Sequence, residues 1–160
     1  MTFLDAMRKL YVMLLSIAAV SALALTVMTV ALPDHTGELR MSAEVGDHFT
    51  IEINGKTDQK FTVTEVLDDG YKVEIDIDGD KSTYTMMREE FYRYIYLDKN
   101  STETMERYGR IILDTQYGKR MCTLYDQQMG SYWIDTNGVI YMSFVGGVEN
   151  RLLETSLFID

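Results

Sequence analysis

The chain has 160 residues, 46% of them hydrophobic, and a formal net charge of −10 at pH 7. Residues 1–33 carry a net charge of +1, so the 127 residues that follow, enough for one domain with its own core, carry −11. A domain this acidic repels phosphate backbones and anionic lipid surfaces, which argues against nucleic acid as a partner and against attachment along a membrane surface.

The first predicted element is a transmembrane helix over Leu10–Leu32, a stretch of 23 residues without a charged side chain. As a helix it spans roughly 34 Å, enough to cross a hydrocarbon core of about 30 Å. Arg8 and Lys9 precede it, and basic flanks stay on the cytoplasmic side. We therefore expect a single-pass membrane protein with residues 1–9 in the cytoplasm and everything after Pro33 outside.

A cleaved secretory signal is the alternative for the same segment. Thr29 and Ala31 are small enough for cleavage after Ala31, which would make the protein secreted. The apolar stretch exceeds the usual signal core of about 7–15 residues, so we favour the uncleaved anchor. Both interpretations deliver residues 34–160 to the same side of the membrane.

The part outside the membrane begins with residues 33–45, where Pro33 and Gly37 indicate a short stalk, and continues as a β domain over residues 46–160. Hydrophobic and polar residues alternate along segments that are separated by turn sequences, as in an antiparallel sheet with one buried face. The first four strands are expected at 48–53, 61–67, 71–78 and from 83 onward, and the turns at Asn54-Gly55, Asp68–Gly70 and Asp78-Gly79.

The segment Met87–Leu97 is ambiguous. Helical spacing places Met87, Phe91 and Ile95 on one face, and Arg88-Glu89-Glu90 favours helix, so we predict a short helix that covers one end of the sheet. Strand spacing would instead align Tyr92, Tyr94 and Tyr96, as in a stacking platform for sugars.

The polar segment Asp98–Glu106 is predicted to be a loop, and strand patterns then resume. They occur near residues 108–114, 120–126, 132–134, 139–145 and 152–159. The predicted fold class is therefore mainly β: an N-terminal transmembrane helix, then an antiparallel meander of about nine strands, half-barrel or barrel-like, with one short helix.

Cys122 is the only cysteine, so the domain has no internal disulfide and must be held by its core. It lies in an apolar run and is expected to be a small buried side chain. His35 and His48 are distant from it in sequence, which indicates neither a zinc site nor a catalytic cysteine–histidine pair.

The sequence nominates few other site residues. Glu74, Asp76, Asp78 and Asp80 resemble part of a calcium-binding loop, but the first ligand is Glu and Thr85 stands where a bidentate Glu is required. The preferred interpretation is a solvated acidic strand face, and a weak surface Ca²⁺ site is the alternative.

Asn100-Ser101-Thr102 matches an N-glycosylation acceptor in a polar segment on the exported side. The chain contains no G-x-S-x-G, H-E-x-x-H, phosphate-loop or dinucleotide motif. The sequence therefore predicts a non-catalytic protein without a cofactor.

Three motifs resemble those of archaeal surface proteins with an N-terminal membrane segment and a β-rich exported domain. They are Val45-Gly46-Asp47-His48-Phe49, Asp114-Thr115-Gln116-Tyr117-Gly118-Lys119-Arg120 and Asp135-Thr136-Asn137-Gly138-Val139-Ile140-Tyr141. The layout is also similar to the half-barrel of lipoprotein-carrier proteins, in which a curved sheet and a helix enclose an apolar cavity. The resemblance covers roughly residues 45–158 and implies no catalytic residues.

Two functions follow as hypotheses. The favoured one is a structural or interaction domain at the cell surface that meets another envelope protein. The alternative is a carrier or binding module for an apolar, lipid-like ligand, since the many Met and Tyr side chains suit an adaptable pocket. A pocket of about 300–1,000 Å³ with apolar walls would favour the carrier, and a densely packed interior would favour the interaction domain.

Overall fold

Nine antiparallel strands form one open sheet in the computed structural model, which describes residues 37–128 and 130–159. Two short helices, α2 (Arg88–Tyr92) and α3 (Lys99–Glu103), connect its fourth and fifth strands. The strands are β1 (His48–Ile53), β2 (Thr57–Val66), β3 (Gly70–Ile77), β4 (Asp80–Met87), β5 (Glu106–Thr115), β6 (Gly118–Gln127), β7 (Gly130–Ile134), β8 (Ile140–Val145) and β9 (Val148–Thr155). A mainly β fold of nine strands is confirmed.

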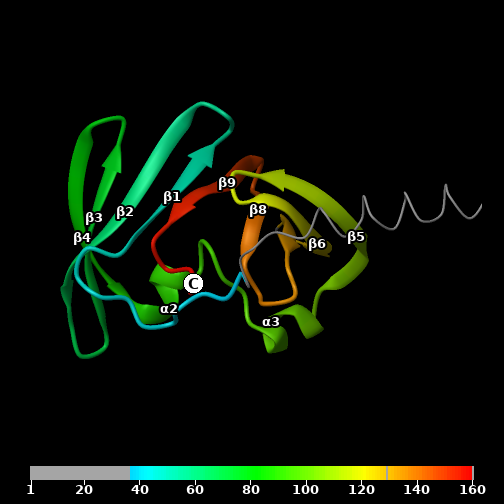
Figure 1. Cartoon of the computed structure of the whole chain (residues 1–160), viewed down its shortest axis with the longest axis horizontal. Coiled ribbons are helices and arrows are strands. Elements are labelled where there is room, and N and C mark those ends of the chain that lie inside the picture. Colours follow the sequence, from blue (N-terminus) through cyan, green and yellow to red (C-terminus); the bar gives the residue numbers. More distant parts are fainter. Residues whose placement is uncertain (1–36, 129, 160) are drawn as a thin grey trace, which may run out of the picture. The chain divides into compact units, whose positions relative to one another are not determined.

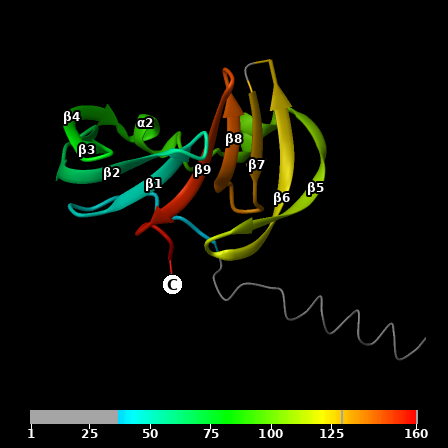
Figure 2. The same ribbon diagram turned by 90° about the horizontal axis from the view of Figure 1, so that it is seen from above.

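The order of the strands differs from a single meander. It is β4-β3-β2-β1-β9-β8-β7-β6-β5, so two meanders meet where the first strand pairs with the last. Phe49 lies opposite Thr155 and Ile53 opposite Asn150 in this central pair. The consecutive strands β4 and β5 consequently lie at opposite ends of the curved, half-barrel-like sheet (Figures 1 and 2).

The predicted hairpin turns between the first strands are confirmed. Asn54 and Asp78 have φ angles of 53° and 54°, values that Asn and Asp tolerate better than other non-glycine residues. Each is followed by a glycine that also has a positive φ. These dipeptides fit the tight turns whose twist matches that of the flanking strands.

The hydrophobic core lies on the face of the sheet that α2 covers. Alternate residues of β1, β2 and β3 point into it, and Phe49 and Phe61 stack with ring centroids 4.5 Å apart. Phe91 of α2 packs edge-on against Phe49 at 5.0 Å. Residues from the other half of the sheet, including Cys122 and Leu152, belong to the same cluster. One continuous core therefore joins both halves.

The connection between β4 and β5 departs from the prediction in two places. The helix expected over 87–97 is confined to α2, because Met87 still pairs with Gly70 at the end of β4. The loop expected over 98–106 contains α3, so the domain has two short helices rather than one. Asp98 begins α3 as its N-cap, accepting a hydrogen bond of 2.8 Å from the backbone N–H of Ser101.

The two ends of the domain also differ from expectation. The last strand is β9 at Val148–Thr155 instead of 152–159, and the residues after it leave the sheet to pair with the segment before β1, where Phe158 bridges Leu39. Leu39 and Ala43, predicted to be in a stalk, are 8% and 5% exposed. Residues 37–45 are therefore part of the folded domain.

The predicted transmembrane helix over Leu10–Leu32, and the alternative cleavage site after Ala31, lie outside the described residues. Within residues 37–128 and 130–159, no helix is long and apolar enough to span a membrane.

Candidate functional site

The aspartate of the Val45–Phe49 motif is the centre of a polar network at the start of β1. Asp47 is 9% exposed, and both of its carboxylate oxygens accept hydrogen bonds of 2.8 Å from the Nη2 atom of Arg40. The backbone N–H of Glu44 and the hydroxyl of Ser156 donate to the same carboxylate at 2.6 and 3.1 Å. We call Arg40, Asp47 and Ser156 the Asp47 clasp. It ties the segment before β1 to the segment after β9.

The Asp114–Arg120 motif makes a second tie to the end of β9. Tyr117 lies in the β5–β6 turn, and its hydroxyl accepts a hydrogen bond of 2.6 Å from the backbone N–H of Thr155. Its ring packs edge-on against Phe158, with centroids 4.8 Å apart. This motif therefore anchors the C-terminal segment of the domain.

The Asp135–Tyr141 motif forms the turn before β8. One carboxylate oxygen of Asp135 accepts hydrogen bonds from the backbone N–H groups of Asn137 at 2.8 Å and Val139 at 3.0 Å. The turn also contacts the connection between β4 and β5, because the N–H of Leu97 donates to the carbonyl of Gly138 at 2.9 Å. Each of the three motifs thus has a structural role in joining segments that are distant in sequence.

A buried polar cluster lies behind this turn. Arg120 is 6% exposed and its guanidinium carbon is 5.9 Å from the centre of the Tyr141 ring, in a cation–π arrangement. Burial raises the pKa of Asp135 above its usual range, although backbone N–H groups stabilise its carboxylate. Burial, and then the charge of Asp135, also raise the pKa of Tyr141. The cluster combines charges with a hydroxyl; Arg120 and Tyr141 are buried, and Asp135 is partly exposed.

Cys122 adjoins the same cluster and is fully buried. Burial, with a contribution from the charge of Asp135, raises the pKa of its thiol to about 12. A thiol with this pKa remains protonated at neutral pH, and the nucleophilic form of cysteine is the thiolate. The environment of Cys122 is therefore opposite to the one that activates a catalytic cysteine.

His48 lies elsewhere, at the start of β1. Its Nε2 atom is 3.2 Å from a carboxylate oxygen of Glu154, and its Nδ1 atom is 3.3 Å from the carbonyl of Gly46. The hydroxyl of Ser156 donates to Asp47 and accepts from the backbone of His48 rather than from its ring. A serine–histidine–aspartate relay requires a contact between the ring and the hydroxyl, so this group does not have that geometry.

The acidic residues considered for calcium lie along the β3–β4 hairpin. Lys81 contacts the carboxylates of Glu74 at 2.8 Å and Asp76 at 3.9 Å. Asp76 also accepts from the backbone N–H of Gly79 in the turn. No group of three or more His, Cys, Asp and Glu side chains suited to a metal ion occurs in the described part of the chain, Asp78 and Asp80 included.

The other candidates occupy the connection between β4 and β5. Asn100 is exposed within α3, where its side chain is accessible for modification. The three tyrosines do not form a platform, because Tyr92 is buried with its hydroxyl donating to the carbonyl of Arg40, and Tyr96 bridges Val139. Tyr94 is 44% exposed while its ring lies 4.9 Å from that of Phe61.

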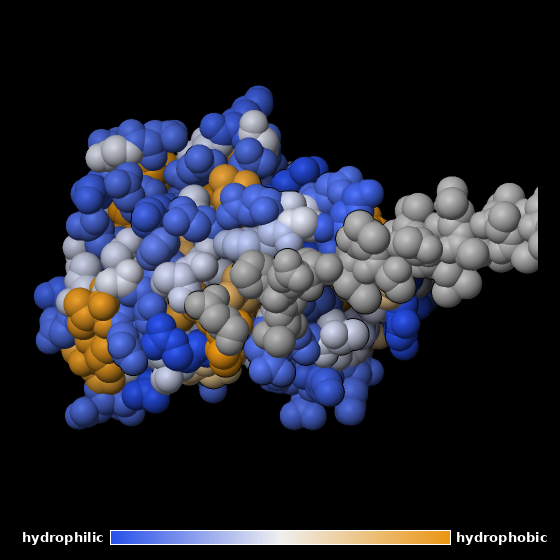
Figure 3. All heavy atoms as spheres, viewed as in Figure 1, coloured by the Kyte–Doolittle hydropathy of each residue, from blue (hydrophilic) through white to orange (hydrophobic). Residues whose placement is uncertain are grey.

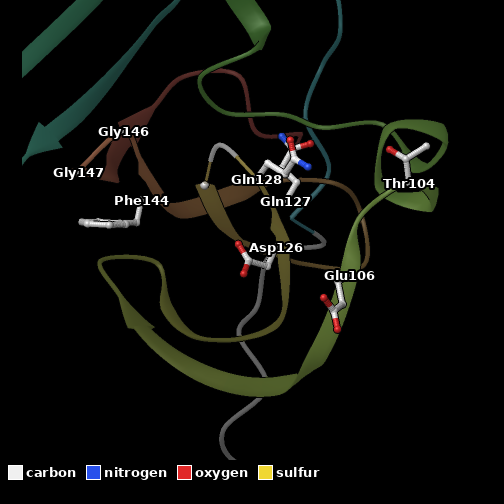
Figure 4. A pocket seen from close by; sticks show the side chains of 9 residues that line it. Thr104, Glu106, Asp126, Gln127, Gln128, Phe144, Gly146 and Gly147 are labelled. Carbon is white, nitrogen blue, oxygen red and sulfur yellow. The ribbon is translucent and has the colours of Figure 1, made fainter.

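An open polar groove lies where β5 and β7 begin and β6 and β8 end (Figure 4). Its volume is about 1030 Å³, and Glu106 and Asp126 lie directly opposite each other in the register of β5 and β6. A hydrogen bond to Glu106, followed by the charge of the same carboxylate, raises the pKa of the exposed Tyr108 hydroxyl beside them. Among the nine described residues that line the groove, Phe144 supplies the only large apolar side chain. The groove suits polar or cationic groups rather than a lipid-like ligand.

The aromatic residues between α2 and the first strands of the sheet are closely packed. Phe91 packs against Phe49 and Tyr71 with ring centroids 5.0 and 5.1 Å apart, and these rings are at most 1% exposed. Such spacing is that of directly contacting rings. The outer surface differs from this packed region. The face of the molecule seen in Figure 3 is mainly hydrophilic, with hydrophobic atoms in separate groups.

Comparison with protein families, with curated proteins and with solved structures finds no match to this chain.

The sequence pointed to one part of the Asp47 clasp and missed the rest. Asp47 belongs to the Val45–Phe49 motif, but nothing local in the sequence indicates Arg40 or Ser156, which join it through tertiary structure. The groove was not predicted either. The acidic residues of β5 and β6 were visible in the sequence, but only the pairing of the two strands places Glu106 beside Asp126.

Proposed function

We propose that this protein is a non-catalytic domain, held at the cell membrane by Leu10–Leu32 and displayed outside the cytoplasm, that contacts another envelope protein. The observation that carries the proposal is the close packing of aromatic side chains between α2 and the first strands of the sheet. Phe49, Phe61 and Phe91 are each 0% exposed, and the ring of Phe49 packs against both of the others. Binding is then left to the outer surface.

The surface around the polar groove supports this function. Glu106 and Asp126 present two carboxylates side by side, and like charges directly opposite each other on a sheet are unfavourable unless a cation approaches. A partner with Lys or Arg side chains would relieve this repulsion. The net charge of −10 favours basic partners in the same way.

The chemical environment of Cys122 supports the non-catalytic assignment. Its thiol is buried with a pKa of about 12, and His48 contacts Glu154 instead. The carrier remains the second candidate, because the open, half-barrel-like sheet is the feature it shares with lipoprotein-carrier proteins.

Protease treatment of intact cells, followed by native mass spectrometry, tests the location and separates the two functions. Protease added outside the cell should remove the domain from the membrane fraction, and its protection would contradict the proposed topology. The released domain should have the mass of its polypeptide alone. A lipid retained through gentle purification would instead establish the carrier.

A further inference from the structure

The strand β5 is an unpaired sheet edge that carries exposed apolar side chains. Among the residues that the structure describes, it pairs with β6 alone, and eight of its ten residues are exposed. Ile111 and Ile112 are 42% and 62% exposed, and Met121 on β6, directly opposite Ile112, is 57% exposed. Free backbone groups beside apolar side chains make an edge prone to pairing with a further strand.

The regular part of β5 is centred on Ile112. The register with β6 shifts between Arg107 and Gly109, which interrupts the strand at its start, and regular pairing then runs from Gly109 to Thr115. An antiparallel contact between two identical strands has a two-fold axis, and that axis passes between one residue and the same residue of the other copy. Ile112 is the middle residue of the seven.

A two-fold axis at Ile112 places opposite charges against each other. Arg110 then lies opposite the partner's Asp114, and Asp114 lies opposite the partner's Arg110. Both residues are exposed, and neither has an ion pair within 4.0 Å among the described residues. Opposite charges across neighbouring strands stabilise a sheet.

The same axis also matches the apolar side chains. Ile112 meets the partner's Ile112 on the face that carries Met121, and Ile111 meets the partner's Leu113 on the other face. Apolar contacts would therefore form on both sides of the joined sheet, and the exposed isoleucines would leave water.

The neighbouring registers lack this match. An axis at Arg110 would place the two arginines against each other and Glu106 opposite the partner's Asp114, which are both like-charge contacts. An axis at Ile111 would place Arg110 opposite the partner's Ile112 and Asp114 opposite the partner's Tyr108. Of these three registers, the one about Ile112 is the one that places opposite charges against each other.

We propose that two copies of this chain join β5 to β5, antiparallel, about a two-fold axis at Ile112. The pairing extends the sheet continuously from one copy into the other. It goes beyond the proposed function, because it holds whether or not another envelope protein binds the domain.

Cysteine cross-linking of the full chain in detergent tests the register. Residues directly opposite in an antiparallel sheet have Cα atoms about 4.5–5.5 Å apart, within the range that a disulfide spans. Ile112→Cys should therefore cross-link to the partner's Cys at the same position under mild oxidation. Arg110→Cys should not, since the two copies of that residue would lie four residues apart along the strands, about 13 Å. Tyr84→Cys, on the other sheet edge and 52% exposed, is the matched control. Equal cross-linking of all three variants, or of none, would overturn the proposal.

A charge exchange tests the same contact without cysteine chemistry. Arg110→Asp places two like-charge pairs at the junction and should weaken the dimer about tenfold or more, as measured by analytical ultracentrifugation of the full chain. The double variant Arg110→Asp/Asp114→Arg restores opposite charges and should restore the dimer. A chain that is monomeric throughout, or a dimer that Arg110→Asp leaves unchanged, would refute pairing through β5. The second result would assign the association to another surface, such as the predicted membrane segment.

Discussion

Replacing Asp47 with alanine should destabilise the whole domain, because it removes the acceptor of the Asp47 clasp. Four hydrogen bonds end on this carboxylate, two of them from the Arg40 guanidinium, and the carboxylate is 9% exposed. Hydrogen bonds to charged groups contribute about 1.5–3 kcal/mol and neutral ones about 1 kcal/mol. The sum overestimates the effect, since the Arg40 side chain is 34% exposed and regains water when its partner is lost.

We therefore expect the free energy of unfolding to fall by about 3 kcal/mol. For a domain of this size that corresponds to a loss of about 10 °C in Tm. Urea denaturation of the chain, followed by tryptophan fluorescence from its single Trp, measures the change.

Glu44→Ala is the matched control. Glu44 pairs with the same arginine at 3.2 Å, but its side chain is 82% exposed, so its loss should cost less than about 0.5 kcal/mol. The backbone N–H that Glu44 donates to Asp47 is unaffected by the substitution. If Asp47→Ala were no more destabilising than Glu44→Ala, the clasp would contribute nothing to stability and the reasoning would be refuted.

Three further predictions concern the turn before β8 and the buried thiol. Gly138→Ala should lower the free energy of unfolding by about 3 kcal/mol, because φ is +89° there and an added Cβ would lie 2.6 Å from the carbonyl oxygen of Leu97. Gly146→Ala, where φ is +60° and the space around the residue is open, should lower it by about 1 kcal/mol. Equal melting temperatures for the two variants would contradict this. Cys122 should resist alkylation at pH 8 until the chain is unfolded, and rapid labelling of the native protein would show that the thiol is accessible. Burial raises the pKa of the Cys122 thiol from 9.0 to about 12. The stability that the protonated thiol contributes is therefore complete below pH 9 and is lost as the pH rises towards 12. Cys122→Ala should accordingly lose less stability than the unsubstituted chain over this alkaline range.

The local features of the fold were predictable because short sequences determine them. Asn54-Gly55 and Asp78-Gly79 require positive φ angles that few other residue pairs adopt, and the structure has both turns. The second helix was missed although Asp98 is a good N-cap, because Lys99–Glu103 lacks the apolar periodicity that normally identifies a helix.

The long-range features had no local signal. The pairing of β1 with β9 depends on which strands remain unpaired after the hairpins form, and alternating hydrophobicity does not encode a partner. The Asp47 clasp has the same origin, since Asp47 and Ser156 are 109 residues apart. The motif around Asp47 is visible in the sequence, but only the folded chain shows that Asp47 joins Arg40 to Ser156.

The central position of the β1–β9 pair has a consequence for how the domain folds. The hairpins on either side of it contain contacts between residues close in sequence, which form quickly, whereas the middle of the sheet requires residues about a hundred positions apart to meet. Until Val148–Thr155 has been synthesised, β1 has no second neighbour and Phe49 has only part of its surroundings. The nascent chain therefore exposes apolar strands from β1 onward until β9 emerges, so completion of the sheet waits for β9 and is sensitive to chaperones and to truncation before that strand.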